Sequence, residues 1–282
     1  MHRLVVQHPT LSDAAVAAFA DAVGTAPSRR EPALAVWPRA AIRGERVGAL
    51  AGALAVDAEI VRPGLRLADF RLAAFDMDST LITIECVDEI ADYVGRKAEV
   101  AAITEAAMRG EIADYDESLR RRVALLAGLP ETTLERVWTE RVRLQPGAEA
   151  LVAGLKAAGL RTLVVSGGFT FFTERLRARL GLDVARSNLL EVEHGRLTGR
   201  LVGPIVNAER KQRIVEQACA QLGCVPSQAI VVGDGANDLR MMSIAGLSVA
   251  FHAKPIVRDE TTHAINHCGL DAILAFFDAP RG

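Results

Sequence analysis

The chain has 282 residues, of which 50% are hydrophobic and 24% are charged. This length and composition fit a soluble globular protein with one large domain and an appendage, or with two modest domains. The formal net charge of -2 gives no basic excess for nucleic acid or for an anionic membrane. No apolar stretch reaches the roughly 18 to 20 residues that span a bilayer, so we expect neither a nucleic-acid partner nor a membrane anchor.

The first 70 residues have the pattern of a small α+β domain. Strands and helices are predicted in alternation, at 4–6, 12–23, 33–37 and 44–56. A Pro-Gly turn signal follows at 63–64. This segment carries no cluster of reactive side chains. We therefore expect residues 1–70 to form an appendage, for which regulation is one role to consider.

From residue 71 to residue 282 the pattern is that of an α/β domain. Short apolar segments predict strands at 72–75, 161–165, 229–232 and 247–250. Such continuous apolar segments are typical of strands buried on both faces of a parallel sheet, and the helical patterns between them indicate a Rossmann-like core. About 85 residues with mainly helical periodicity separate the first two strands, which is too long for a simple crossover. We expect a helical cap inserted at about 84–150.

Polar residues follow the first two predicted strands, where the carboxyl ends of parallel strands bind ligands. Asp76 and Asp78 come directly after the first strand. Carboxylates this close repel each other in a dry site, and Mg²⁺ would relieve that repulsion. Ser166 and Gly167 end the second strand, where a hydroxyl and glycine amides can hold an anion. Taken singly, each motif could also be an exposed turn.

Two further motifs come later in the chain. Asn207 is predicted to cap a helix, which places Lys211 in its first turn. The helix dipole disfavours a cation there, so an anionic partner would explain Lys211, whereas the alternative is a surface lysine. Asp234 and Asp238 follow the third strand of the core. Position 238 is not glycine, so this segment is not a dinucleotide-binding GxGxxG motif.

In this order, the four motifs resemble those of the haloacid dehalogenase superfamily. Within it, the chain is similar to the phosphoserine phosphatase family over about residues 70–275. The resemblance rests on the segments 76–80, 85–89, 107–111, 118–123, 166–170, 233–239, 245–247 and 252–255. Some members of this family carry an amino-acid-binding regulatory domain at the N-terminus, but residues 1–70 do not clearly match one.

The resemblance implies a Mg²⁺-dependent phosphatase that hydrolyses O-phospho-L-serine to serine and phosphate, the last step of serine biosynthesis. Asp76 would be the nucleophile and a metal ligand. Asp78 would protonate the leaving oxygen and then activate water, with its main-chain carbonyl on the metal. Asp234 would complete the protein ligands of the metal, oriented by Asp238.

The resemblance also assigns the substrate contacts. The phosphate would be held by a hydroxyl, an amide, a cation and a side-chain amide, namely Ser166, Gly167, Lys211 and Asn237. Glu85 and Arg122, from the cap, would bind the ammonium and carboxylate groups of the substrate. One acid and one base select a zwitterion, and the guanidinium fork matches a carboxylate.

Two departures from the family pattern concern the cap. Tyr115 stands where the family usually has phenylalanine, and together with Met108 it is expected to line the cap. One extra residue between Met108 and Arg122 leaves Arg121 as an alternative carboxylate ligand.

Several alternatives remain open from the sequence. The same core motifs serve many substrates, so a phosphatase for another small phosphomonoester is one alternative. A non-enzymatic amino-acid sensor is another. Homodimer formation and feedback by serine are also left open. The four cysteines lack CxxC spacing and the N-terminus lacks a long apolar segment, which predicts a cytoplasmic protein without zinc.

Overall fold

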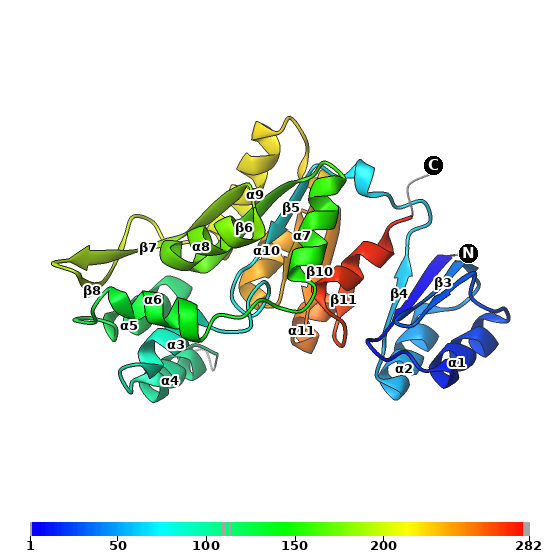
Figure 1. The fold of residues 1–282 in the computed structure, drawn as a ribbon, viewed down its shortest axis with the longest axis horizontal. Helices are drawn as coiled ribbons and strands as arrows, with labels where there is room; N and C mark the ends of the chain where they lie inside the picture. The colour runs from blue at the N-terminus through cyan, green and yellow to red at the C-terminus, as the bar shows by residue number, and fades with distance from the viewer. Residues whose placement is uncertain (1, 109–110, 113, 279–282) are drawn as a thin grey trace.

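The computed structural model describes residues 2–108, 111–112 and 114–278. These residues form two sheets, of four and seven strands. The smaller sheet and its helices lie at one end of the molecule, and the cap lies at the other end, with the larger sheet between them (Figure 1). Among the described helices, none combines the length and apolar character that crossing a membrane requires.

The N-terminal unit is an antiparallel sheet covered by two helices. Its strands, in the order β2-β3-β1-β4, are β1 (His2–Gln7), β2 (Arg29–Glu31), β3 (Leu34–Ala40) and β4 (Asp57–Val61). The helices are α1 (Asp13–Val23) and α2 (Gly44–Leu54). They pack on the face that carries Leu4, Val6 and Trp37. The four predicted elements are present, whereas β2 and β4 were missed: β2 consists of three exposed charged residues, and polar and apolar residues alternate only briefly in β4.

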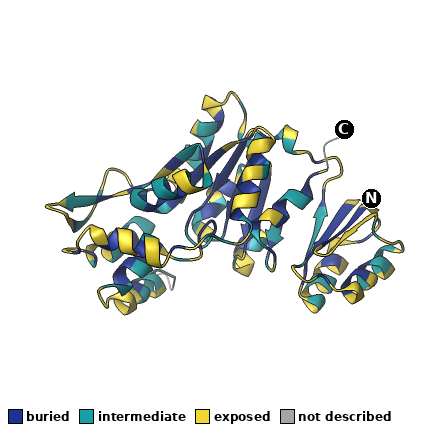
Figure 2. Ribbon diagram, viewed as in Figure 1, coloured by how far each residue is buried: buried dark blue, intermediate teal, exposed yellow. Residues whose placement is uncertain are grey.

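The opposite face of the N-terminal sheet packs against the core. Val5, Val36 and Val61 belong to the same hydrophobic cluster as Phe70 and Phe276 of the larger unit. The small sheet therefore has apolar side chains on both of its faces, and Figure 2 shows its two central strands, β1 and β3, as largely buried. The apolar run of Leu4, Val5 and Val6 in β1 fits this burial of both faces.

The larger sheet is a mixed, mainly parallel sheet in the order β11-β10-β9-β5-β6-β7-β8. Its strands are β5 (Leu72–Phe75), β6 (Arg161–Phe169), β7 (Val184–Glu193), β8 (Arg196–Val202), β9 (Ala229–Gly233), β10 (Leu247–Phe251) and β11 (His263–Ile265). Only the β7–β8 pair is antiparallel among these pairings. The four predicted core strands, which became β5, β6, β9 and β10, are confirmed.

Helices cover both faces of this sheet. They are α7 (Ala148–Ala157), α8 (Thr170–Leu180), α9 (Ala208–Gln221), α10 (Leu239–Ser243) and α11 (Pro255–Asp259), with 3-10 turns η1 (Leu67–Asp69), η2 (Pro226–Gln228), η3 (Ala236–Asp238) and η4 (Leu270–Phe276). Phe75 and Val164 face the cluster that contains α7 and α8. Ala74 and Leu163 face the cluster that contains α9 and α10. The alternation along each strand explains why these segments read as continuously apolar.

Four described helices lie between β5 and α7 and form the cap: α3 (Cys86–Asp92), α4 (Lys97–Met108), α5 (Tyr115–Ala124) and α6 (Thr132–Glu140). The predicted cap range of 84–150 also includes the start of α7, but α7 packs on β6 and η4. The β7–β8 hairpin reaches the cap, where Leu197 exchanges backbone hydrogen bonds with Gly128 and Leu129. This hairpin was not predicted from the sequence, because most of its residues are at least partly exposed and many are polar.

Candidate active site

Asp76 lies at the carboxyl end of β5, in the middle of the sheet. The Asp76 N–H extends the pairing of β5 with β9 by donating a hydrogen bond to the Val232 carbonyl at 3.0 Å. The carboxylate is buried, with 5% of the residue exposed, and its Oδ1 accepts the Met77 N–H at 2.7 Å. The chain then turns sharply, and Ser79 adopts a left-handed φ of 57°. Strain of this kind in a non-glycine residue is frequent at functional sites.

Lys211 is fully buried between two carboxylates. Its Nζ lies 2.9 Å from Asp76 Oδ1 and 2.7 Å from Asp238 Oδ1. Burial lowers the pKa of Lys211, but Asp238 and Asp76 outweigh burial and raise it, so the lysine is charged. As predicted, Asn207 caps α9 by accepting the Arg210 N–H at 3.0 Å. The alternative of a surface lysine is wrong.

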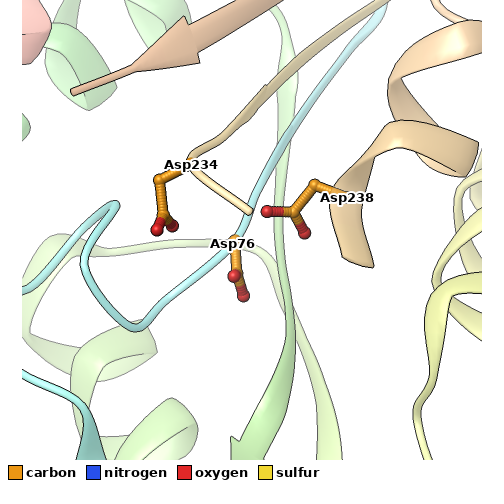
Figure 3. A group of neighbouring side chains, drawn as sticks. All are labelled: Asp76, Asp234 and Asp238. Carbon is orange, nitrogen blue, oxygen red and sulfur yellow. The ribbon is translucent and has the colours of Figure 1, made fainter. Parts of the chain in front are cut away.

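Three carboxylates meet beside Lys211. Oxygen atoms of Asp76, Asp234 and Asp238 lie within 4.8 Å of one another (Figure 3). Thr80 donates a hydrogen bond to Asp234 Oδ1 at 2.8 Å, and was given no role in the sequence analysis. Burial and the nearby Asp238 raise the pKa of both Asp76 and Asp234 to about 7, although Lys211 acts in the opposite direction. The site is therefore crowded with negative charge.

This donor set fits a divalent cation. Both oxygens of Asp238 are engaged, Oδ1 by Lys211 and Oδ2 by the Gly235 N–H at 3.1 Å. By contrast, none of the described residues donates a hydrogen bond to Oδ2 of Asp76 or of Asp234. Free carboxylate oxygens in a crowded acidic site suit Mg²⁺. Asp76 and Asp234 are among the predicted ligands, and the main-chain contribution of Asp78 stays a prediction.

The predicted anion cradle lies at the end of β6. Ser166 is buried, and its Oγ accepts the Gly168 N–H at 2.8 Å. The pairing of β6 with β7 shifts register between Val165 and Phe169, so the strand itself continues through the glycines instead of ending before them. A Cβ on Gly168 would lie 2.9 Å from Asp78 Oδ2, which explains why glycine is required there.

Asp78 lies beside this cradle with an unsatisfied carboxylate. Its Oδ1 is buried and has no hydrogen-bond partner in the described structure. Burial, followed by the Glu85 carboxylate, raises the pKa of Asp78 well above its ordinary value. A buried carboxyl in this state can hold a proton at neutral pH. The structure thus places next to Asp76 a group that is suited to proton transfer.

Two charged residues of opposite sign complete the site from the cap. Glu85 directly precedes α3 and accepts the Ser79 hydroxyl at 2.7 Å. Arg122, from α5, has a buried Nε without a hydrogen-bond partner in the described structure. Arg121 instead pairs with Glu117 at 2.8 Å on the outside of the cap. Geometry therefore favours Arg122 over Arg121 as the residue that faces a ligand.

A cavity of about 90 Å³ joins these groups. It is lined by Asp76, Asp78, Glu85, Val87, Tyr115, Leu119, Arg122, Ser166, Gly167, Gly168, Asp234 and Asn237. Lys211 and Asp238 do not line it, because Lys211 is buried between the carboxylates of Asp76 and Asp238. Val87 and Leu119 were not predicted to line the site, because in the sequence they are ordinary apolar positions of α3 and α5. The predicted contact of Met108 lies outside the side chains that the structure describes, as do Arg109 and Gly110 of the cap motif.

Comparisons with known proteins agree with this arrangement. Residues 73–243 match the family of haloacid dehalogenase-like hydrolases. A phosphoserine phosphatase of Polaromonas sp. is 61% identical over 219 residues, which cover 76% of this chain and 93% of that protein. The chain belongs to the phosphoserine phosphatase family.

Two solved structures extend the similarity beyond the catalytic unit. A HAD family hydrolase from Salmonella enterica serovar Typhi has a TM-score of 0.89 at 32% identity, covering 100% of both chains. A probable phosphoserine phosphatase from Vibrio cholerae, in its unliganded form, has a TM-score of 0.83 at 37% identity, covering 98% of this chain and 86% of that chain. The N-terminal sheet is therefore a feature that this member of the phosphoserine phosphatase family shares with solved structures.

Proposed function

We propose that this protein hydrolyses O-phospho-L-serine to L-serine and phosphate, and so catalyses the last step of serine biosynthesis. The observation that carries this proposal is the cavity itself. A carboxylate paired with a buried lysine lies at its base, and Glu85 and Arg122 enter from the cap. The unpartnered Arg122 Nε requires an acceptor, which the substrate carboxylate would supply. Glu85 would pair with the ammonium group.

In the first step, a carboxylate oxygen of Asp76 attacks phosphorus and the bond from phosphorus to the serine oxygen breaks. Asp78 gives its proton to that oxygen, which its raised pKa allows. Ser166, the Gly167 amide and Asn237 would hold the phosphoryl oxygens. The charged Lys211 offsets the negative charge that gathers at the nucleophile.

In the second step, water cleaves the aspartyl-phosphate. Asp78, now a carboxylate, takes a proton from the water as its oxygen attacks phosphorus, and phosphate leaves with Asp76 restored. A cap closed over the cavity would exclude bulk water, so that the phosphoryl group passes from the serine oxygen to Asp76 and only then to a single water molecule.

Magnesium fits this proposal. Asp76 and Asp234 would hold the ion through their free oxygens, together with the main-chain carbonyl of Asp78. The positive charge of a bound Mg²⁺ would offset the repulsion between the phosphate dianion and the carboxylates. Asp238 would act indirectly: it would hold Lys211 in place through their ion pair and hold the turn at Gly235 by accepting its N–H.

Phosphate release from a panel of phosphomonoesters tests the function. We expect strong preference for L-phosphoserine over D-phosphoserine, phosphothreonine and a sugar phosphate, and loss of activity with a chelator. Variants Arg122→Ala and Glu85→Ala should lose this preference, while Arg121→Ala serves as the matched control on the same helix. A preference for another ester, or full phosphoserine turnover in both cap variants, would support a phosphatase with a different substrate.

Three further expectations belong to this proposal. Residues 1–70 would form a separate domain from residues 71–282, with the cap at about 84–150. The protein would work in the cytoplasm, where serine is made. Dimer formation and feedback by serine stay predictions, which a measurement of oligomeric state and of inhibition by serine would test.

A further inference from the structure

Tyr115 is the first residue of α5 and lines the cavity from the cap. Its hydroxyl lies against Gly167, because a Cβ at position 167 would come within 2.3 Å of the Tyr115 hydroxyl oxygen. Glycine is therefore the only residue that leaves room for this hydroxyl. Gly167 belongs to the cradle formed with Ser166, so the hydroxyl reaches across from the cap to the anion-binding part of the core.

The Tyr115 hydroxyl is a hydrogen-bond donor in need of an acceptor. No described residue forms a hydrogen bond with it, and Tyr115 is half-buried at the wall of the cavity, where water or a ligand can accept the bond. Burial raises the pKa of Tyr115, and Lys211 and Arg122 lower it only in part, so the hydroxyl keeps its proton at neutral pH. Since this donor borders a cavity, a ligand in the cavity would supply the acceptor.

Two anionic groups of the substrate could accept this bond, and the geometry distinguishes them. The substrate carboxylate belongs with Arg122. The phosphoryl group belongs with Ser166 and Gly167, and the hydroxyl lies directly against Gly167. Lys211 pairs with Asp76 at the base of the cavity. Its charge also lowers the pKa of Tyr115 more than the charge of Arg122 does. The hydroxyl is therefore at the phosphoryl end.

We propose that the Tyr115 hydroxyl binds the phosphoryl group of the substrate by donating a hydrogen bond to one of its oxygens. This inference rests on the proposed function and adds a residue of the cap to phosphate recognition. Because the donor sits on α5, the bond forms only when the cap is closed over the core. A phenylalanine at this position cannot make it.

The test compares the wild-type protein with Tyr115→Phe. We expect binding of inorganic phosphate, measured by calorimetry with Mg²⁺ present, to weaken by about 10-fold, as for the loss of a hydrogen bond to a charged group. The value of kcat/KM for phosphoserine should fall by a similar factor, while inhibition by L-serine stays unchanged. Tyr93→Phe is the matched control, since the Tyr93 hydroxyl bonds Glu140 within the cap and does not line the cavity.

The outcomes separate this inference from the function on which it rests. Unchanged phosphate binding in Tyr115→Phe would overturn the inference. Phosphoserine turnover by the wild type would still support the proposed function in that case. Weaker inhibition by L-serine with unchanged phosphate binding would also overturn it, because it would place the hydroxyl on the carboxylate. If the wild type did not turn over phosphoserine, the proposed function would fail, and the phosphate measurement would still decide the role of Tyr115. Thermal unfolding of both variants verifies that they are folded.

Discussion

At the scale of single residues, the site is organised around one buried cation and several carboxylates. Lys211 carries the positive charge, and Asp76 and Asp238 share it at 2.9 and 2.7 Å. Burial, followed by the negative charge of Asp238, raises the pKa of Asp76 to about 7. Repulsion between these buried carboxylates destabilises the folded protein, but the same groups are needed for the reaction. Lower stability in return for activity is common at active sites.

The nucleophile can be tested at this scale. Asp76→Asn keeps the size of the side chain and removes its charge, so we expect phosphoserine turnover to fall at least about 10,000-fold, as for removal of a nucleophile. The protein should stay folded, because Lys211 keeps its pair with Asp238. Steady-state kinetics and thermal unfolding check both parts. Ample residual turnover in a folded variant would assign the attack on phosphorus to another group.

At the scale of elements, helix α5 joins the cap to the core. Its N-cap residue, Asp114, accepts the Asp116 N–H at 3.0 Å. The Asp116 carboxylate in turn accepts a hydrogen bond from Asn207 Nδ2 at 3.0 Å. Asn207 also caps α9, the helix that carries Lys211. One asparagine thus links the closed cap to the helix beneath the catalytic centre.

This link predicts an effect on substrate binding. In Asp116→Ala the hydrogen bond between cap and core is lost, which shifts the cap toward open states and should raise KM for phosphoserine by about 3- to 10-fold. We expect kcat to change less than KM. Glu117→Ala is the matched control, since Glu117 pairs with Arg121 on the surface of the same helix. Equal KM values in the two variants would contradict a role for Asp116 in closure.

At the scale of the whole molecule, side chains of β4 attach the N-terminal sheet to the edge of the larger one. Asp57 accepts backbone N–H groups from residues 266, 267 and 268, at 2.7, 3.1 and 2.9 Å. Glu59 accepts the N–H of Ala264 in β11 at 3.1 Å. Carboxylates therefore occupy backbone donors in the edge strand β11 and in the three residues directly after it, which would otherwise be open to pairing with another chain.

Loss of this attachment should destabilise the protein. In Asp57→Asn, an amide nitrogen replaces one acceptor and faces N–H donors, so we expect the free energy of unfolding to fall by about 2 to 4 kcal/mol. Asp21→Asn, at an exposed position of α1, is the matched control and should be neutral. Urea denaturation of both variants measures the difference. A stability equal to that of the wild type would mean that the three hydrogen bonds contribute nothing to docking.

The sequence alone determined the core strands, and it predicted the cap as an insertion and the chemistry at the strand ends, because these depend on local periodicity and on short motifs such as the one around Asp76. Only the tertiary structure decided that Arg122 and not Arg121 faces the cavity, and that Lys211 is buried between two carboxylates. It also revealed the β7–β8 hairpin and the docking of β4. The physical reason is that each of these features depends on contacts between residues far apart in the chain. Polar segments such as β4 form strands only because a distant partner satisfies their side chains.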